Sequence, residues 1–361
     1  MNEYSYIIKY LSYLWNNAFL ILLSTEAIKE AFLAYLIGKG YDIKDISKVY
    51  TPKLKLNNKN IKLRNDISCK SKAEINKFID VIIKNFDISV LKNFYNNISE
   101  LLVIDNVGSY HSIYDCEYNT IKYNNLPVIY HELFHMSSTY FVNNKNCLLC
   151  YSGFCFVEYK DFKTFSIGNG LNEGYTDLMT ERYFEEEYRK FIHPYWLEKN
   201  IASHLEIIVG KSLMEKLYLT SNLKGLINEL NKYKSNVEIA EFLTKFDFVC
   251  KYLRIICWSD GIKKRKIELY LKSIYKFLID TYVIKLKEEL NKNIITADDF
   301  INLAFEYIKS FDNYFVFNGT NYQIFSKDDI NKIFDDLYDY ITNYCSKKDT
   351  IYVLKKDLEH K

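Results

Sequence analysis

The segment His131-Glu132-Leu133-Phe134-His135 has the residue types and the spacing of a metal-binding helix. Two histidines four positions apart lie on one face of a helix, where both imidazoles can bind the same ion. The intervening Glu132 can hold and deprotonate a water molecule bound to that ion. About 0.006 accidental matches are expected for the few histidines of this chain, so chance explains the pattern poorly.

The neighbouring sequence supports a buried helix from about Leu126 to Val142. This stretch contains one carboxylate, Glu132, and neither Lys nor Arg. A helix that is apolar on all sides is normally buried, and buried imidazoles and carboxylates are usually paired or bound to metal. The alternative is that His131 and His135 are core residues satisfied by hydrogen bonds, with Glu132 in a salt bridge.

A third ligand is available where Asn172-Glu173-Gly174-Tyr175-Thr176-Asp177 opens another expected helix. A catalytic zinc ion usually has three protein ligands, and two histidines with one glutamate form an established set. Glu173 and Asp177 lie four positions apart and face the same way. Glu173 can therefore bind the metal while Asp177 accepts the outer N–H of a ligand histidine.

The pattern His-Glu-x-x-His followed by Asn-Glu-x-x-x-Asp resembles the thermolysin-like, or gluzincin, zinc metallopeptidases. The resemblance implies one zinc ion per chain, bound by His131, His135 and Glu173. It also implies that Glu132 is the general base and that Asp177 orients His131. It covers about a quarter of the chain, residues 105 to 185.

Two other families share part of the pattern. The clostridial neurotoxin proteases are similar in their His-Glu-Leu-x-His helix and distant Glu, but they lack Asn-Glu-x-x-x-Asp. Peptide deformylases combine His-Glu-x-x-His with an upstream cysteine ligand, for which Cys116 is available. That alternative leaves the downstream pattern unexplained. The gap of 38 positions between His135 and Glu173 (173 minus 135) is longer than in thermolysin itself.

The resemblance implies two further features of the catalytic centre. Thermolysin-like enzymes hold the peptide substrate against an edge strand, for which Val107–Ile113 is the candidate; an ordinary internal strand is the alternative. They also supply a His or Tyr downstream of the third ligand to stabilise the oxyanion. His193, His204, Tyr175 and Tyr218 are available for this role, and the sequence does not choose among them.

These residues predict hydrolysis of a peptide bond in a peptide or protein substrate. Zinc lowers the pKa of a bound water molecule, and Glu132 transfers the proton to the leaving amine. The alternative is a catalytically inactive, zinc-containing helical module that binds other proteins. Such a structural zinc site would normally be closed by a fourth protein ligand.

Charge and hydropathy limit the partners and the location that we expect. The chain has 48 basic and 46 acidic residues, which gives no electrostatic reason to expect nucleic acid or an anionic membrane. Met1–Lys9 lacks the features of a secretory signal, and the apolar run Ala18–Leu23 is too short to span a bilayer. We expect a cytoplasmic protein without a membrane span; the sequence does not indicate its oligomeric state.

Eight cysteines are scattered along the chain without regular spacing. In a large chain without an export signal we expect reduced thiols. Cys147, Cys150 and Cys155 lie close together in the sequence and could bind a second metal, but three cysteines are one ligand short of a structural zinc site.

The pattern of apolar residues predicts the elements that position these groups. Helical periodicity covers Tyr6–Leu23, Ile28–Ile37 and Ile75–Phe94. Strands are expected at Leu101–Ile104 and Tyr118–Tyr123, and a hairpin between Leu148 and Ile167. From Glu181 onward the pattern is helical almost throughout, with the longest expected helices at Ile262–Leu290 and Asp328–Tyr344.

The expected fold is therefore mainly α, with a small α+β zincin-like catalytic core in which a short sheet and hairpin accompany the metal-binding helix. We divide the chain into an N-terminal helical segment (1–100), this core (101–185) and a C-terminal helical domain (186–361).

Overall fold

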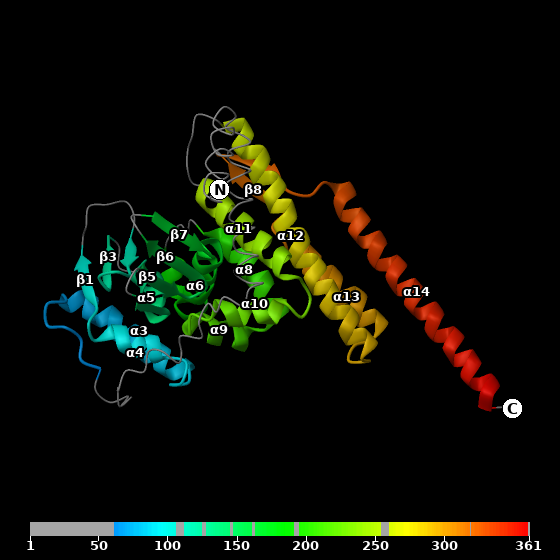
Figure 1. Cartoon of the computed structure of the whole chain (residues 1–361), viewed down its shortest axis with the longest axis horizontal. Coiled ribbons are helices and arrows are strands. Elements are labelled where there is room, and N and C mark those ends of the chain that lie inside the picture. Colours follow the sequence, from blue (N-terminus) through cyan, green and yellow to red (C-terminus); the bar gives the residue numbers. More distant parts are fainter. Residues whose placement is uncertain are drawn as a thin grey trace, which may run out of the picture. The chain divides into compact units, whose positions relative to one another are not determined.

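The computed structural model is mainly helical with small sheets (Figure 1), as expected from the sequence. It describes residues 61–105, 112–124, 128–144, 147–160, 163–190, 195–253, 260–317 and 319–359. The helices expected at Tyr6–Leu23 and Ile28–Ile37 lie outside this part. Within it, no helix combines the length and the apolar character needed to cross a membrane.

The chain forms two compact units, Met1–Ile255 and Ile256–Lys361. This division differs from the boundaries that we drew at residues 100 and 185. The reason is packing: helices before residue 101 contact the metal-binding helix, and helices after residue 185 contact the helix that carries Glu173. The candidate core is therefore enclosed by both flanks inside the first unit.

The first unit begins with two described helices, α3 (Cys69–Asn85) and α4 (Lys92–Ile98). Ser68 caps α3, because its side chain accepts a hydrogen bond from the backbone N–H of Ser71. The sequence predicted one helical stretch over Ile75–Phe94. The structure breaks it after Asn85, where the Asp87 carboxylate accepts the N–H of Ser89 in a turn.

A three-stranded sheet follows, formed by β1 (Leu102–Asp105), β2 (Ile113–Asp115) and β3 (Thr120–Tyr123). The strand order is β1-β3-β2, with β3 parallel to β1 and antiparallel to β2. The strands expected near Leu101 and before Tyr123 are thus confirmed. Of the candidate edge strand Val107–Ile113, residues 107–111 lie outside the described part, and Ile113 begins β2 at the sheet edge.

The helix α5 (Ile129–Ser137), which carries the two candidate ligand histidines, is shorter than the predicted stretch from Leu126 to Val142. Hydroxyl groups bind its last carbonyl oxygens: Ser137 Oγ donates to Leu133 at 2.7 Å and Thr139 Oγ1 to His135 at 2.7 Å. Aromatic and β-branched residues then favour extended backbone. The helix therefore ends before the strand β4, which begins at Thr139.

Four antiparallel strands form the second sheet, in sequential order: β4 (Thr139–Asn144), β5 (Cys147–Ser152), β6 (Cys155–Lys160) and β7 (Lys163–Ile167). The expected hairpin is confirmed and is part of this larger sheet. Tyr140 and Tyr151 are paired across β4 and β5, and their rings stack with centroids 4.9 Å apart.

Six helices complete the first unit: α6 (Asn169–Tyr183), α7 (Glu185–Tyr188), α8 (Trp196–Val209), α9 (Lys211–Leu219), α10 (Leu223–Leu230) and α11 (Asn236–Leu253). Helix α6 follows Gly168, where φ is +83° and an added Cβ would lie 2.0 Å from the Phe154 carbonyl oxygen. The Asp247 carboxylate on α11 accepts the N–H groups of Gly168 and Gly170 at 2.8 and 2.9 Å. It thereby satisfies donors at the start of α6.

An aromatic cluster fixes α5 against its neighbours. Phe78 of α3 meets Phe134 of α5 edge-on, with ring centroids 5.1 Å apart. Phe184, just after α6, stacks on both Phe78 and Tyr130, at 5.5 and 4.0 Å. All four side chains are buried. The cluster therefore joins α3, α5 and the end of α6 into one core.

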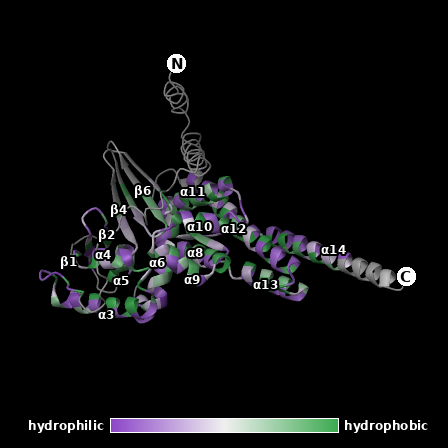
Figure 2. Ribbon diagram, turned by 60° about the horizontal axis from the view of Figure 1, so that its bottom comes forward, coloured by the Kyte–Doolittle hydropathy of each residue, from purple (hydrophilic) through white to green (hydrophobic). Residues whose placement is uncertain are grey.

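The second unit contains α12 (Asp260–Asn291), α13 (Ala297–Lys309), β8 (Tyr314–Phe317), β9 (Thr320–Gln323) and α14 (Lys327–Glu359). The two long helices expected here, α12 and α14, are confirmed. Figure 2 shows hydrophobic and hydrophilic residues alternating along α13. The β8–β9 hairpin is an exception to the almost continuous helix expected in this region. An aromatic and β-branched run, Tyr314–Phe317, forms the first strand.

Candidate metal centre

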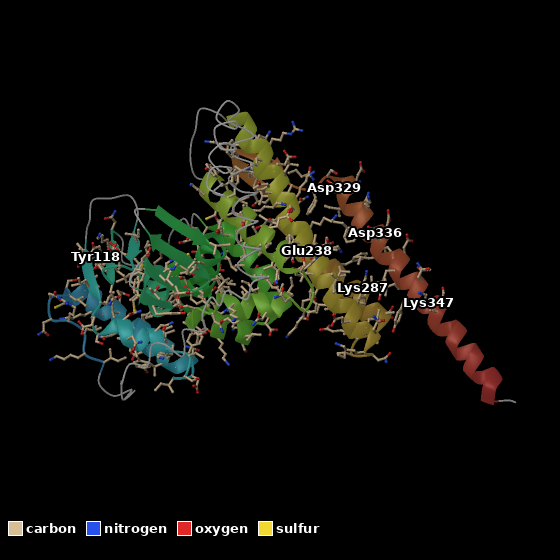
Figure 3. All side chains as sticks on the ribbon, in the orientation of Figure 1. Tyr118, Glu238, Lys287, Asp329, Asp336 and Lys347 are labelled. Atoms are coloured by element: carbon tan, nitrogen blue, oxygen red, sulfur yellow. The ribbon has the colours of Figure 1, made fainter. Side chains whose placement is uncertain are left out.

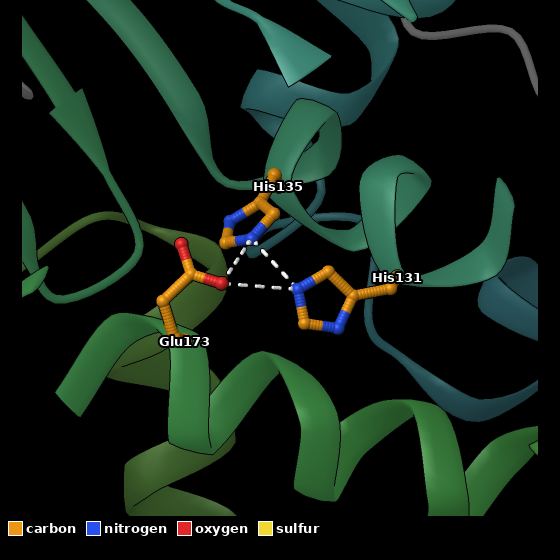
Figure 4. A group of neighbouring side chains, drawn as sticks. All are labelled: His131, His135 and Glu173. Carbon is orange, nitrogen blue, oxygen red and sulfur yellow. Dashed lines mark hydrogen bonds and ion pairs between the residues drawn. The ribbon is translucent and has the colours of Figure 1, made fainter. Parts of the chain in front are cut away.

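Three side chains from two helices converge on one point in the first unit (Figure 4). His131 and His135 come from successive turns of α5, and Glu173 comes from the first turns of α6. The two Nε2 atoms are 3.1 Å apart, and Glu173 Oε2 lies 3.2 Å from His131 Nε2 and 3.5 Å from His135 Nε2. Among the described residues, this is the one group of three His, Cys, Asp or Glu side chains close enough to hold a metal ion.

The spacing of these three atoms fits a zinc ion. Tetrahedral ligands with bonds of about 2.0–2.1 Å to zinc lie about 3.3 Å from one another. The three separations in the structure, from 3.1 to 3.5 Å, lie on both sides of that value. Each of the three atoms is an acceptor when it ligates a metal, so one cation at their centre satisfies all three.

The outer nitrogen of His131 faces a chain of polar groups. Its Nδ1 lies 3.6 Å from Asp177 Oδ1. Asp177 Oδ2 accepts a hydrogen bond of 2.6 Å from the Tyr188 hydroxyl, to which Lys199 Nζ donates at 3.0 Å. Asp177 and Tyr188 are buried. These hydrogen bonds therefore hold the Asp177 carboxylate in place beside the His131 ring.

The outer nitrogen of His135 has two neighbours that favour opposite tautomers. Asn172 Oδ1 accepts the Phe154 N–H, and this orients the Asn172 Nδ2 group toward His135 Nδ1, 3.2 Å away. Because Nδ2 is a hydrogen-bond donor, this contact favours an unprotonated Nδ1. Thr176 Oγ1 lies 3.5 Å from the same Nδ1 and can accept a proton from it. Binding of a cation at Nε2 requires the proton on Nδ1 and therefore selects the contact with Thr176.

The candidate centre is rich in negative charge, with both histidines buried and Glu173 half-buried. His131, His135 and Glu132 are 7%, 8% and 6% exposed. Burial opposes ionisation of Glu173, but the adjacent His135 and His131 hold the pKa of this carboxyl well below its usual value. Burial also lowers the pKa of His131, yet hydrogen bonds to Asp177 and Glu173 raise it to about 10. Glu173 and Asp177 thus supply negative charge that favours a cation.

Glu132 lies beside the three ligand atoms without being one of them. Burial raises the pKa of its carboxyl, an effect that His131 and His135 oppose. The backbone N–H of Tyr114, in the edge strand β2, forms a hydrogen bond with this carboxylate. The edge strand and the carboxylate proposed as the base are therefore direct neighbours.

The four candidate oxyanion donors are placed differently. Tyr218, on α9, bonds Thr176 Oγ1 through its hydroxyl at 2.6 Å, behind His135. The Tyr175 hydroxyl is directed to Glu206, and His204 Nδ1 lies 2.7 Å from the backbone oxygen of Asn200, one turn earlier in α8. His193 lies outside the described residues.

Tyr195 is a neighbour of the centre that the sequence did not reveal. Its ring lies parallel to that of His131, with an angle of 10° and centroids 5.2 Å apart. The residue is half-buried and directly precedes α8. Because the chain contains 33 tyrosines and Tyr195 matches no motif, nothing in the sequence distinguished it.

The described contacts bear on the cysteines considered as alternative or additional ligands. Cys116, the possible upstream ligand of a deformylase-like centre, contacts Cys150 with its Sγ and does not belong to the ligand group. The side chain of Cys147 lies outside the described part. Cys116, Cys150 and Cys155, which are described, form no metal-binding group of three.

We compared the chain with protein-family models, curated proteins and solved structures, and no match was found. The likeness to gluzincins therefore stays a resemblance of motifs.

Proposed function

We propose that the protein is a zinc metallopeptidase that hydrolyses peptide bonds. The observation that carries this proposal is the convergence of His131 Nε2, His135 Nε2 and Glu173 Oε2, with separations of 3.1–3.5 Å. Zinc is favoured because two imidazoles and one carboxylate are an established ligand set of catalytic zinc.

His131, His135 and Glu173 would hold zinc with three protein ligands, the number usual for a catalytic ion. A structural zinc site would be closed by a fourth protein ligand, and the described residues contribute three to this group. This difference favours an enzyme over a protein-binding module with a structural metal.

The bound metal and Glu132 have different roles in the proposed reaction. Bound zinc supplies Lewis-acid chemistry, polarising the substrate carbonyl and lowering the pKa of a water molecule. Glu132 accepts the proton of the attacking water and returns it to the leaving amine. Burial raises the pKa of the Glu132 carboxyl, which favours this exchange because a stronger base accepts the proton more readily.

We place the substrate backbone along β2. This strand is at the edge of its sheet, and Tyr114 connects it directly to Glu132. A peptide that pairs with a sheet edge gains main-chain hydrogen bonds whatever its sequence. Such pairing would bring a scissile carbonyl close to the carboxylate base.

Zinc stoichiometry of the purified chain tests the proposal. We expect about one zinc ion per chain in the wild type and a large loss in Glu173→Ala, which removes one of the three ligands. Glu229→Ala is the matched control, since Glu229, on α10, pairs with Lys232 and neither residue belongs to the ligand group. A wild-type chain that contains no zinc after purification without chelators, and regains none on addition, would refute the proposal.

A further inference from the structure

Two thiols from distant parts of the first unit lie in contact outside the metal centre. Cys150 donates its S–H to Cys116 Sγ, with the sulfur atoms 3.3 Å apart. Cys150 lies in β5, and Cys116 follows β2. A disulfide bond is about 2.05 Å long, so the sulfur atoms must approach by about 1.2 Å to form one.

We propose that Cys116 and Cys150 form a thiol–disulfide exchange site that a low-molecular-weight disulfide oxidises to an intramolecular disulfide bond. The proposal is independent of the zinc centre and of peptidase activity.

Exposure assigns different roles to the two thiols. Cys116 is partly exposed, in the turn before β3, where Tyr118 (labelled in Figure 3) is 65% exposed. Cys150 is 1% exposed. The reagent therefore reaches Cys116, and the Cys150 S–H stabilises the Cys116 thiolate by donating to its sulfur.

The exchange has two steps that balance. The Cys116 thiolate attacks one sulfur of glutathione disulfide, forming a mixed disulfide and releasing one glutathione thiolate. Cys150, after losing its proton, attacks Cys116 Sγ and releases the second glutathione. The two protein sulfurs lose two electrons in total, and glutathione disulfide gains them.

Cys155 is a third described thiol of this region, and its sulfur contacts a different group. Its Sγ donates to Asn169 Oδ1 at 3.0 Å. The Cys150 thiol is directed to Cys116 instead. The two contacts distinguish Cys150 from Cys155 as the partner of Cys116.

The bond would join the two sheets around the metal-binding helix. The loop between Cys116 and Cys150 contains β3, α5 and β4. Tyr114, which contacts Glu132 through its N–H, is two residues before Cys116. Oxidation would therefore tie the edge strand to β5 without using any proposed ligand.

The test is peptide mapping of the full chain after equilibration with reduced and oxidised glutathione. The protein is alkylated, digested without reduction and analysed by mass spectrometry. We expect Cys116 and Cys150 to become protected together, in one disulfide-linked pair of peptides, and to return to thiols when reduced glutathione is in excess. Cys345, a partly exposed thiol in α14, is the internal control for exposure alone and should form no protein disulfide.

Two variants check the order of the steps. Cys150→Ser should stop at a mixed disulfide on Cys116, and Cys116→Ser should leave Cys150 reduced. The mapping of the wild type decides the question even where a variant folds poorly. A stable mixed disulfide on wild-type Cys116, a bond between Cys150 and Cys155, or full alkylation of both thiols in excess glutathione disulfide would overturn the proposal.

Discussion

At the scale of single residues, the two carboxylates of the candidate centre have separate tasks. Glu173 Oε2 contacts both imidazoles, whereas Glu132 is bound by the Tyr114 N–H instead. The separation means that metal binding and proton transfer can be removed one at a time.

Glu132→Gln should retain zinc and lose catalysis. The amide keeps the size of the side chain but cannot accept the proton of water, so we expect kcat to fall by about 10²–10⁴-fold. Zinc content and peptide hydrolysis measured on the same sample give the comparison. Activity within a few-fold of the wild type would remove Glu132 from the role of base.

Tyr188→Phe should weaken zinc binding although Tyr188 is not a ligand. Its hydroxyl holds Asp177, which faces His131, and loss of such outer contacts typically costs about 10–100-fold in metal affinity. Competition with a chelator of known affinity measures the change. Tyr183→Phe is the matched control, because it removes a hydrogen bond of 2.8 Å to Glu215, a carboxylate that does not contact the ligands. Equal loss of zinc affinity in both variants would contradict the assignment.

At the scale of helices and strands, the sequence predicted those elements that local residue patterns determine. The spacing of His131 and His135 on a helix, and the start of a second helix near Glu173, follow from local periodicity and turn residues. The end of α5 was missed because hydroxyl groups bind its last carbonyl oxygens. Contacts between distant segments, such as Tyr195 on His131 and Cys116 on Cys150, depend on packing that no local pattern records.

The packing of α6 on α8 should be sensitive to one methyl group. A Cβ at Gly174, next to Glu173, would lie 2.2 Å from the backbone oxygen of Glu198. We expect Gly174→Ala to separate the helices, lowering the free energy of unfolding by about 1–3 kcal/mol and reducing zinc affinity. Gly225→Ala is the control, because its nearest neighbour is the movable side chain of Leu217. Denaturant unfolding and zinc titration measure the two effects. If Gly174→Ala had the stability and zinc affinity of the wild type, α6 and α8 would be shown to adjust freely.

At the scale of the whole molecule, the two compact units divide the described chain at residue 255. Every described residue assigned to the centre, from His131 to Tyr218, belongs to the first unit. The second unit contributes α12, α13, α14 and the β8–β9 hairpin.

The fragment 1–255 should therefore bind about one zinc ion with the affinity of the full chain, and the fragment 256–361 should bind none. Elemental analysis of the two purified fragments checks this expectation, and circular dichroism establishes that each is folded. A folded first fragment without zinc would mean that residues after 255 complete the centre.

The contact of Asp247 with Gly168 and Gly170 has a consequence for biosynthesis. The start of α6 is held by a carboxylate that the ribosome adds 74 residues after Glu173 (247 minus 173). At roughly 5–20 residues per second, this is a delay of about 4 to 15 s. During that interval both imidazoles and Glu173 have been synthesised, but α6 lacks its final anchor. A nascent chain would therefore meet the cell's zinc before its binding centre is fully assembled.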